Sequence, residues 1–188
     1  MSDQQGASAV DKLLDAASRL FYTRGVPNVG INEIIARAGV ARMTLYHHFP
    51  SKDALVKAVL ERRKAERGEW LNRAANRATT PEGQILAVFE LLIEWAQTPD
   101  FRGCPLVAAT VELGGQLNAA RAYAQAHQDA TTAFFAARAA EAGVAKPSEL
   151  ADELLVLVEG AAIASLVRGS AQPAVSALAA AKRLVAAR

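Results

Sequence analysis

The chain has 188 residues and a formal net charge of +2, and its single cysteine excludes an internal disulfide, so we expect a cytoplasmic protein. A hydrophobic content of 52% with 21% charged residues excludes a disordered chain and fits one large or two small domains. The sequence has no run of 18 apolar residues, so it predicts no transmembrane helix. Its first ten residues do not have the pattern of a secretory signal.

The first predicted element is a helix over residues 7–24. Apolar residues recur along it at helical spacing, which indicates one buried face. Gly25 and Pro27 follow and end the helix, because glycine adopts terminating conformations and proline does not continue a helix.

Residues 31–49, INEIIARAGVARMTLYHHF, predict two short helices joined by a tight turn at Gly39. Glycine suits this turn because it takes positive φ without steric cost. Two short helices with such a turn form a helix-turn-helix, whose second helix enters the DNA major groove. The pattern therefore predicts a DNA-binding module.

The second of these helices carries the predicted DNA contacts. Arg42 would donate two hydrogen bonds to guanine, which is the most common specific base contact. Thr44, Tyr46 and His47 carry donors that suit phosphate oxygens, and Lys52 adds a positive charge just beyond. The alternative is that Tyr46 packs in the core and that Lys52 is an ordinary surface lysine. From their helical phase, we expect His48 and Phe49 to face the core.

The run GVPNVGINEIIARAGVARMTLYHHFPSKDAL resembles the N-terminal signature of TetR-type transcriptional regulators over about residues 10–60. The resemblance implies an all-α fold with a helix-turn-helix DNA-binding domain over residues 1–52. It also implies a helical effector-binding and dimerisation domain over residues 53–188. The implied function is a homodimeric repressor that binds a palindromic, double-stranded operator and responds to a small-molecule effector.

Three positions depart from the family pattern. Gly30 stands where Ser or Thr usually caps the second helix. Ile35 replaces a small residue, and Met43 occupies a position that is often glycine. Because Met43 follows Arg42 directly on the recognition helix, we include it among the DNA-contacting residues and expect it to alter base preference.

The remainder of the chain predicts further helices and no strand with clear alternation, about nine helices in all. A long connecting helix is expected over residues 52–77, with Ser51 as its cap and the charged run ERRKAERGE as a solvated face. The other predicted helices begin at Pro81, Pro105, Asn118, Glu149 and Pro173. The segment Pro147-Ser148 directly precedes Glu149 and is the start signal of that helix.

The positive charge is concentrated in the first part of the chain. Residues 1–68 hold eleven Lys or Arg and seven Asp or Glu, whereas residues 69–188 hold ten and twelve. Phosphate binding requires a basic excess near the helix-turn-helix. A solvated basic face without any partner would show the same distribution.

The helix before the last, with the run ELLVLVEGAAIASLV, is apolar on all sides apart from Glu159 and contains several small residues. A helix of this kind must be buried on all sides. The family resemblance implies that the last two helices form a four-helix bundle with a second copy. The alternative is that this helix lies at the centre of one monomer core.

Cys104, just before the helix expected at Pro105, is a candidate ligand or redox sensor. The N-terminus of a helix stabilises a thiolate, and Arg102 is two residues away. Some TetR-type regulators share an RGC-type segment here, and a subset senses oxidants or electrophiles through its cysteine. The alternative is a small buried apolar residue.

An effector pocket is implied for the C-terminal helices, and we expect an apolar or aromatic ligand. Its candidate lining residues are Trp70, Phe89, Trp95, Phe101, Phe134 and Phe135. Three histidines and one cysteine predict no metal site, and we expect no cofactor. Two rival functions are an enzyme with Cys104 as nucleophile and His127 as base, and a nonspecific architectural DNA-binding protein.

Overall fold

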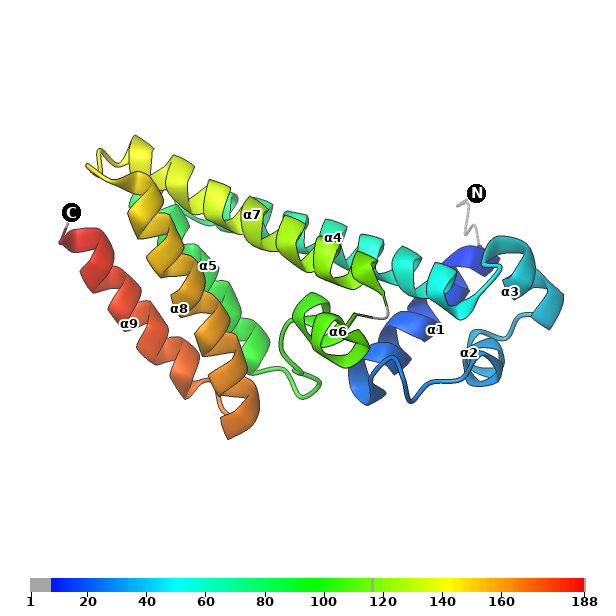
Figure 1. Ribbon diagram of the computed structural model, residues 1–188. Coiled ribbons are helices and arrows are strands. Elements are labelled where there is room, and N and C mark those ends of the chain that lie inside the picture. The colour runs from blue at the N-terminus through cyan, green and yellow to red at the C-terminus, as the bar shows by residue number, and fades with distance from the viewer. Residues whose placement is uncertain (1–7, 116, 188) are drawn as a thin grey trace, which may run out of the picture. The chain divides into compact units, whose positions relative to one another are not determined.

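A computed structural model describes residues 8–115 and 117–187. Over these ranges every regular element is an α-helix (Figure 1). The helices are α1 (Ala9–Arg24), α2 (Ile31–Ala38), α3 (Arg42–His48), α4 (Lys52–Arg77), α5 (Pro81–Ala96), α6 (Pro105–Leu113), α7 (Asn118–Glu141), α8 (Pro147–Arg168) and α9 (Gln172–Ala186). The all-α fold with about nine helices is confirmed. The expected start of the first helix at Ala7 lies outside the described residues.

The chain forms two compact units. The first unit contains Met1–Arg63 and Pro105–Tyr123, and the second contains Lys64–Cys104 and Ala124–Arg188. By residue number, α4 and α7 each contribute to both units. The division of function at residues 52 and 53 stays a prediction, because it concerns which residues bind DNA.

Local sequence signals set the ends of the helices in the first unit. Ser8 and Asp11 form a capping box at the start of α1, in which the Asp11 amide donates to Ser8 Oγ at 3.1 Å. Gly39 ends α2 in the left-handed conformation, with φ of 64°. Gly30 occupies the N-cap position of α2, and because it lacks a side chain this helix start has no side-chain cap. The turn at Gly39 thus forms as its sequence predicts.

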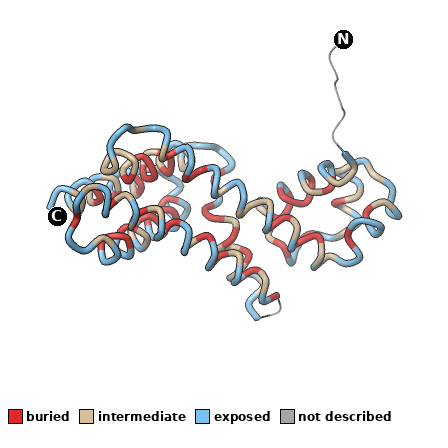
Figure 2. Tube along the Cα trace, turned by 90° about the horizontal axis from the view of Figure 1, so that it is seen from above, coloured by how far each residue is buried: buried red, intermediate tan, exposed pale blue. Residues whose placement is uncertain are grey.

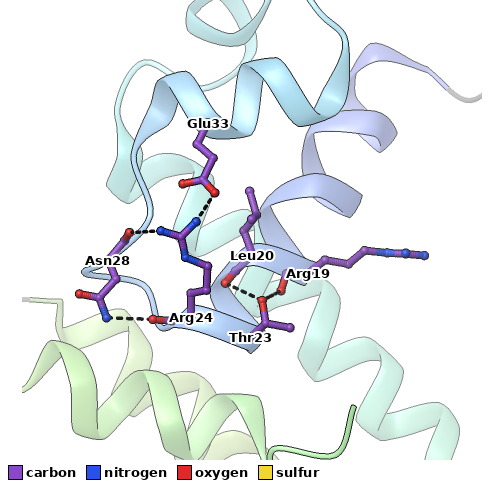
Figure 3. Close-up of polar contacts among 6 residues, drawn as sticks. All are labelled: Arg19, Leu20, Thr23, Arg24, Asn28 and Glu33. Carbon is purple, nitrogen blue, oxygen red and sulfur yellow. Dashed lines mark hydrogen bonds and ion pairs between the residues drawn. The ribbon is translucent and has the colours of Figure 1, made fainter. Parts of the chain in front are cut away.

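Polar contacts connect the end of α1 to the start of α2 (Figure 3). The Arg24 guanidinium donates to the Glu33 carboxylate and, at 3.4 Å, to the Asn28 carbonyl. The Asn28 side-chain amide donates to the Arg24 carbonyl at 2.9 Å, and Thr23 Oγ1 donates to the Arg19 carbonyl at 2.8 Å. These contacts fix the path between α1 and the helix-turn-helix.

The backbone of Val26, in the same connection, is held through both its N–H and its carbonyl. Its N–H donates to Glu112 Oε2 of α6 at 2.7 Å, and its carbonyl accepts from Lys52 Nζ at the start of α4, also at 2.7 Å. Gly25 has φ of 82°, and a Cβ there would lie 3.0 Å from the Glu112 carboxylate. The positive φ favours glycine at this position, and any larger residue would also have to shift the Glu112 side chain.

The second unit has a continuous apolar core. Phe89 and Phe135 are fully buried and stack with ring centroids 6.1 Å apart. Helix α8 packs against α9, and α5 packs against both. Thr80 caps α5 by accepting from the Gly83 amide at 3.1 Å, so that the Thr-Pro start expected from the sequence is observed. Figure 2 shows buried and exposed positions alternating along the helices, as amphipathic helices require.

Candidate functional site

The outer surface of α3 presents most of the predicted DNA-contacting side chains. Arg42 and His47 are exposed, Met43 is 79% exposed and Tyr46 is 38% exposed. Thr44 is half-buried. Leu45 is completely buried and anchors the helix against the core of the first unit. The helix thus has one apolar anchor and a polar outer face.

Two of these side chains lie over each other. The Arg42 guanidinium carbon lies 5.7 Å from the centre of the Tyr46 ring, within the range of a cation–π contact. Such a contact, one helical turn apart, limits the orientations that Arg42 samples. A guanidinium of limited orientation suits a bidentate contact with a base edge.

Lys52 has a structural contact that its sequence position did not predict. Its ammonium donates to the Val26 carbonyl and is half-buried. An ammonium has three N–H donors, so this hydrogen bond leaves donors for a phosphate oxygen. Lys52 is therefore positioned by the loop after α1, and its predicted phosphate contact stays a prediction.

The expected burial of His48 is wrong, whereas that of Phe49 is confirmed. His48 is exposed, and its ring lies 5.0 Å from that of His47 in an edge-to-face arrangement. Phe49 is only 8% exposed. The difference arises because α3 ends at His48: Phe49 leaves the helix with an extended backbone, so helical phase does not set its direction.

A small cavity lies within the second unit, among α4, α5, α7 and α8. Its volume is about 20 Å³, enough for about one water molecule. Its lining residues are Arg67, Trp70, Leu92, Trp95, Cys104, His127, Thr131, Val158, Glu159 and Ala162. Of the aromatic residues expected at a pocket, the two tryptophans line this cavity.

The other expected lining aromatics belong to the core. Phe89 and Phe135 are fully buried and pack against each other. Phe101 is buried and contacts Trp95 edge to face, with ring centroids 4.8 Å apart. Phe134 is half-buried and also packs against Phe135. Phe101 thus contacts a tryptophan of the cavity lining without lining the cavity itself.

Charged side chains in the cavity were not predicted. The Arg67 guanidinium carbon lies 4.0 Å from the Trp70 ring centre and 4.9 Å from the Trp95 ring centre. Glu159 also lines the cavity, and burial raises its pKa while Arg67 partly opposes this rise. The spacing of Arg67 and Trp70, three residues apart on one helix, was the available signal. Arg67 belongs to the run ERRKAERGE, which was expected to form a solvated face and instead contributes this side chain to the cavity.

His127 is a buried neutral base. Burial first, and the nearby Arg67 charge second, lower the pKa of its imidazole to about 4. The Thr131 hydroxyl donates to the His127 carbonyl at 2.9 Å, within α7. Because the cationic form is disfavoured, the imidazole is uncharged at neutral pH.

This burial predicts that the protein becomes less stable in acid. An unfolded His127 takes up a proton below pH 6.5, whereas the folded one does so only near pH 4, so stability is lost as the pH falls between these values. We expect His127 to account for a loss of about 2 kcal/mol in unfolding free energy between pH 7 and 4.5. Urea unfolding at several pH values in this range should show a smaller loss of unfolding free energy in His127→Gln than in the wild type. An equal dependence of unfolding free energy on pH in both proteins would show that His127 is not the group responsible.

Helix α8 exposes a row of apolar side chains. Val156 is 72%, Ile163 is 53% and Val167 is 80% exposed, at spacings that place them along one face. An open groove between α8 and α9 is lined by Asp152, Glu153, Val156, Leu157, Ala180, Arg183, Leu184 and Ala187. One chain therefore does not bury this helix on all sides, contrary to the alternative of a helix at the centre of a monomer core.

The sequence matches two models of one protein family. Residues 13–59 match the model for bacterial regulatory proteins of the tetR family, and residues 81–181 match the tetracyclin repressor-like C-terminal domain. The chain belongs to the TetR family. The first match contains the helix-turn-helix, and the second contains most of the cavity lining.

Curated relatives match part of the chain. A helix-turn-helix transcriptional regulator from Mycobacterium tuberculosis is 44% identical over 62 residues, which are 33% of this chain and 31% of that protein. The regulator LmrA from Bacillus subtilis is 33% identical over 107 residues, 55% of this chain and 57% of LmrA. The matched part thus spans about a third to somewhat over half of these relatives.

Solved structures match almost the whole chain. A TetR-family regulator from Streptomyces coelicolor has a TM-score of 0.89 at 27% identity, covering 95% of this chain and 89% of that one. A TetR-type regulator from Streptomyces avermitilis has a TM-score of 0.77 at 31% identity, covering 94% and 99%. The family fold therefore extends over both units of this TetR-family chain.

None of the described helices is both long and apolar enough to cross a membrane. Among residues 8–115 and 117–187, no three His, Cys, Asp or Glu side chains form a group suited to a metal ion.

Proposed function

We propose that this TetR-family chain is a transcriptional repressor that binds a palindromic operator as a homodimer and is released by an effector. The outer face of α3 carries the proposal, because it combines exposed donors with a buried anchor at Leu45. Arg42 and Met43 would contact bases, whereas Thr44, Tyr46 and His47 would contact phosphates. Lys52 would add a phosphate contact at the start of α4.

The experiment is a gel-shift titration with the DNA upstream of the protein's own gene. We expect a discrete complex that a hundredfold excess by mass of unrelated DNA does not remove, because specific sites exceed nonspecific ones by about 10³–10⁷-fold in affinity. A nonspecific architectural protein would instead be removed by the unrelated DNA. That outcome would contradict the proposal.

The rival enzyme function has one favourable observation and one unfavourable one. Cys104 and His127 both line the cavity. However, an imidazole with a pKa of about 4 is a weak base at neutral pH, and general bases work best with a pKa near the operating pH. An assay of ester hydrolysis with wild type and Cys104→Ser tests this rival: thiol-dependent turnover would support it.

Dimerisation is proposed through α8 and α9. The exposed row of Val156, Ile163 and Val167 would be buried against the same row of a second copy, as a two-fold interface requires. The groove between the helices lies beside this row and contains Asp152, Glu153 and Arg183. These charges would lie toward a polar rim, where interfaces tolerate them.

The effector is proposed to act at the cavity in the second unit. A ligand would have to enlarge it, because ligand pockets usually measure about 300–1,000 Å³. Binding would favour a conformation in which the two DNA-binding heads no longer match the operator, which requires different ligand affinities in the two states. Helix α4, which contributes residues to both units, would connect the two events.

Modification of Cys104 is proposed as a second means of release. Cys104 is 9% exposed and belongs to the cavity lining, so a group added to its thiol would compete for the same space as a ligand. We expect an electrophile such as N-ethylmaleimide to release wild-type protein from operator DNA but to leave Cys104→Ser bound. If the electrophile releases both proteins from DNA, or neither, Cys104 is an ordinary buried side chain and not a sensor.

A further inference from the structure

We infer that the Arg67 guanidinium fills the effector position between two indole rings, and that the effector is a flat organic cation which displaces it. The inference rests on the proposed function, in which this cavity is the effector site. It names the chemical class of that effector, such as an aromatic amidinium or guanidinium compound.

The first support is the geometry around Arg67. Its guanidinium carbon lies 4.0 Å from the Trp70 ring centre and 4.9 Å from the Trp95 ring centre. The rings come from two different helices, α4 and α5, so the cation lies between two aromatic faces rather than on one. Aromatic faces carry negative potential and attract cations, and two such faces form a partial cage. A flat cation from solution would make the same ring contacts.

The second support is the available space. The cavity of about 20 Å³ has room for about one water molecule, so a ligand enters only by displacing a side chain. Trp70 is 4% exposed and Trp95 is packed against Phe101, whereas Arg67 is half-buried and has a long, flexible stem. Displacement of Arg67 therefore disturbs the apolar packing least.

The third support is the charge that remains when Arg67 leaves. Glu159 is the acidic side chain of the lining, and His127 is neutral at physiological pH. Removal of the guanidinium from Glu159 would leave a buried carboxyl and two electron-rich ring faces. A cation bound there can pair with Glu159 in place of the guanidinium, because a nearby positive charge favours the ionised carboxyl, whereas an anion favours the neutral form and gains no partner.

A different occupant would be an anion bound directly by Arg67. It would keep the guanidinium in place and would require room beside it. The lining offers little such room, and the anion would compete with the Glu159 carboxyl for the guanidinium. The observations therefore favour the cation, and an anionic ligand becomes an outcome of the test.

The chain's own fluorescence reports on this site. The sequence contains two tryptophans, and both Trp70 and Trp95 line the cavity. We would titrate the full-length protein with benzamidine, benzamide and benzoate, which are flat, similar in size, and positive, neutral and negative. We expect benzamidine to change the emission at a concentration at least tenfold lower than either of the other two.

Two variants separate the contributions. Arg67→Met removes the internal competitor but keeps a long side chain, and should strengthen benzamidine binding at least threefold. Arg73→Met, at an exposed arginine of the same helix, serves as the charge-matched control and should leave the affinity unchanged. Glu159→Gln should reduce the preference of benzamidine over benzamide.

Tighter binding of benzoate than of benzamidine, with its loss in Arg67→Met, would overturn the inference in favour of an anion site. Failure of all three probes to alter the emission would also overturn it. A gel shift with operator DNA, run separately, tests the proposed function. If benzamidine binds in the expected order while the protein binds no operator, the ligand class stands and the regulatory function fails.

Discussion

The substitution Val167→Glu is expected to convert the protein to a monomer and to weaken operator binding at least a hundredfold. Val167 is 80% exposed on α8, in the row that also contains Val156 and Ile163. In a two-fold interface the two new carboxylates would be buried without a cationic partner, which costs several kcal/mol. Loss of the dimer removes the gain of about 10²–10⁴-fold that comes from binding two half-sites together.

Because Val167 is exposed within one chain, the variant should still fold. Ala164 on the same helix is half-buried, so a charge placed there would disturb the monomer as well. Val111→Glu is the matched control, since Val111 is 78% exposed on α6. Light scattering should give a folded monomer for Val167→Glu and a dimer for Val111→Glu. A dimer in both, with unchanged operator affinity, would place the interface elsewhere.

The substitution Arg42→Ala is expected to remove discrimination at one base pair in each half-site. A good bidentate contact is worth about 1–3 kcal/mol, and a dimer makes it twice, so the total loss is about 2–6 kcal/mol. Operator affinity should therefore fall by about 30-fold to 10⁴-fold. Affinity for unrelated DNA should fall much less, because it depends on phosphate contacts.

Arg37→Ala is the matched control for Arg42→Ala. Arg37 is exposed in the last turn of α2, outside the recognition helix, and its removal costs the same charge. We would measure binding isotherms on the operator and on versions with single base pairs changed. Arg37→Ala should bind these sites in the same order of affinity as the wild type. Arg42→Ala should instead bind all four base pairs with similar affinity at one position of the half-site. An unchanged ranking in Arg42→Ala would remove its assigned role.

The sequence predicted the helices well because their ends depend on local chemistry. Ser51 caps α4 by accepting from the Ala54 amide at 3.1 Å, and α5, α6 and α8 each begin with a proline. Gly169 ends α8 with φ of 59°. Each signal acts within a few residues, so it is readable without tertiary contacts.

The cavity was less predictable because it depends on side chains far apart in the chain. Arg67 and Trp70 are neighbours on α4, but Trp95 and Glu159 come from other helices. Periodicity identifies the buried face of each helix but not which faces meet. The same limit applies to α8: its apolar residues indicate burial, yet only the structure reveals which of them a single chain leaves exposed.

The exposure of His48 shows the limit of helical phase itself. Helix α3 has seven residues and ends at His48, so its last side chains lie where the regular pattern stops. Phe49 is buried by an extended backbone, not by its position on the helix. Short helices therefore weaken any assignment made from periodicity alone.

We propose that two identical DNA-binding domains of this TetR-family chain bind one two-fold DNA site. Selection of bound sequences from random DNA distinguishes this arrangement from binding to a single or asymmetric site. We expect an inverted repeat whose half-sites lie about one helical turn, roughly 34–36 Å, or a multiple of it apart. Recovery of asymmetric sequences, or of no shared sequence, would show that the protein does not bind DNA as a two-fold dimer.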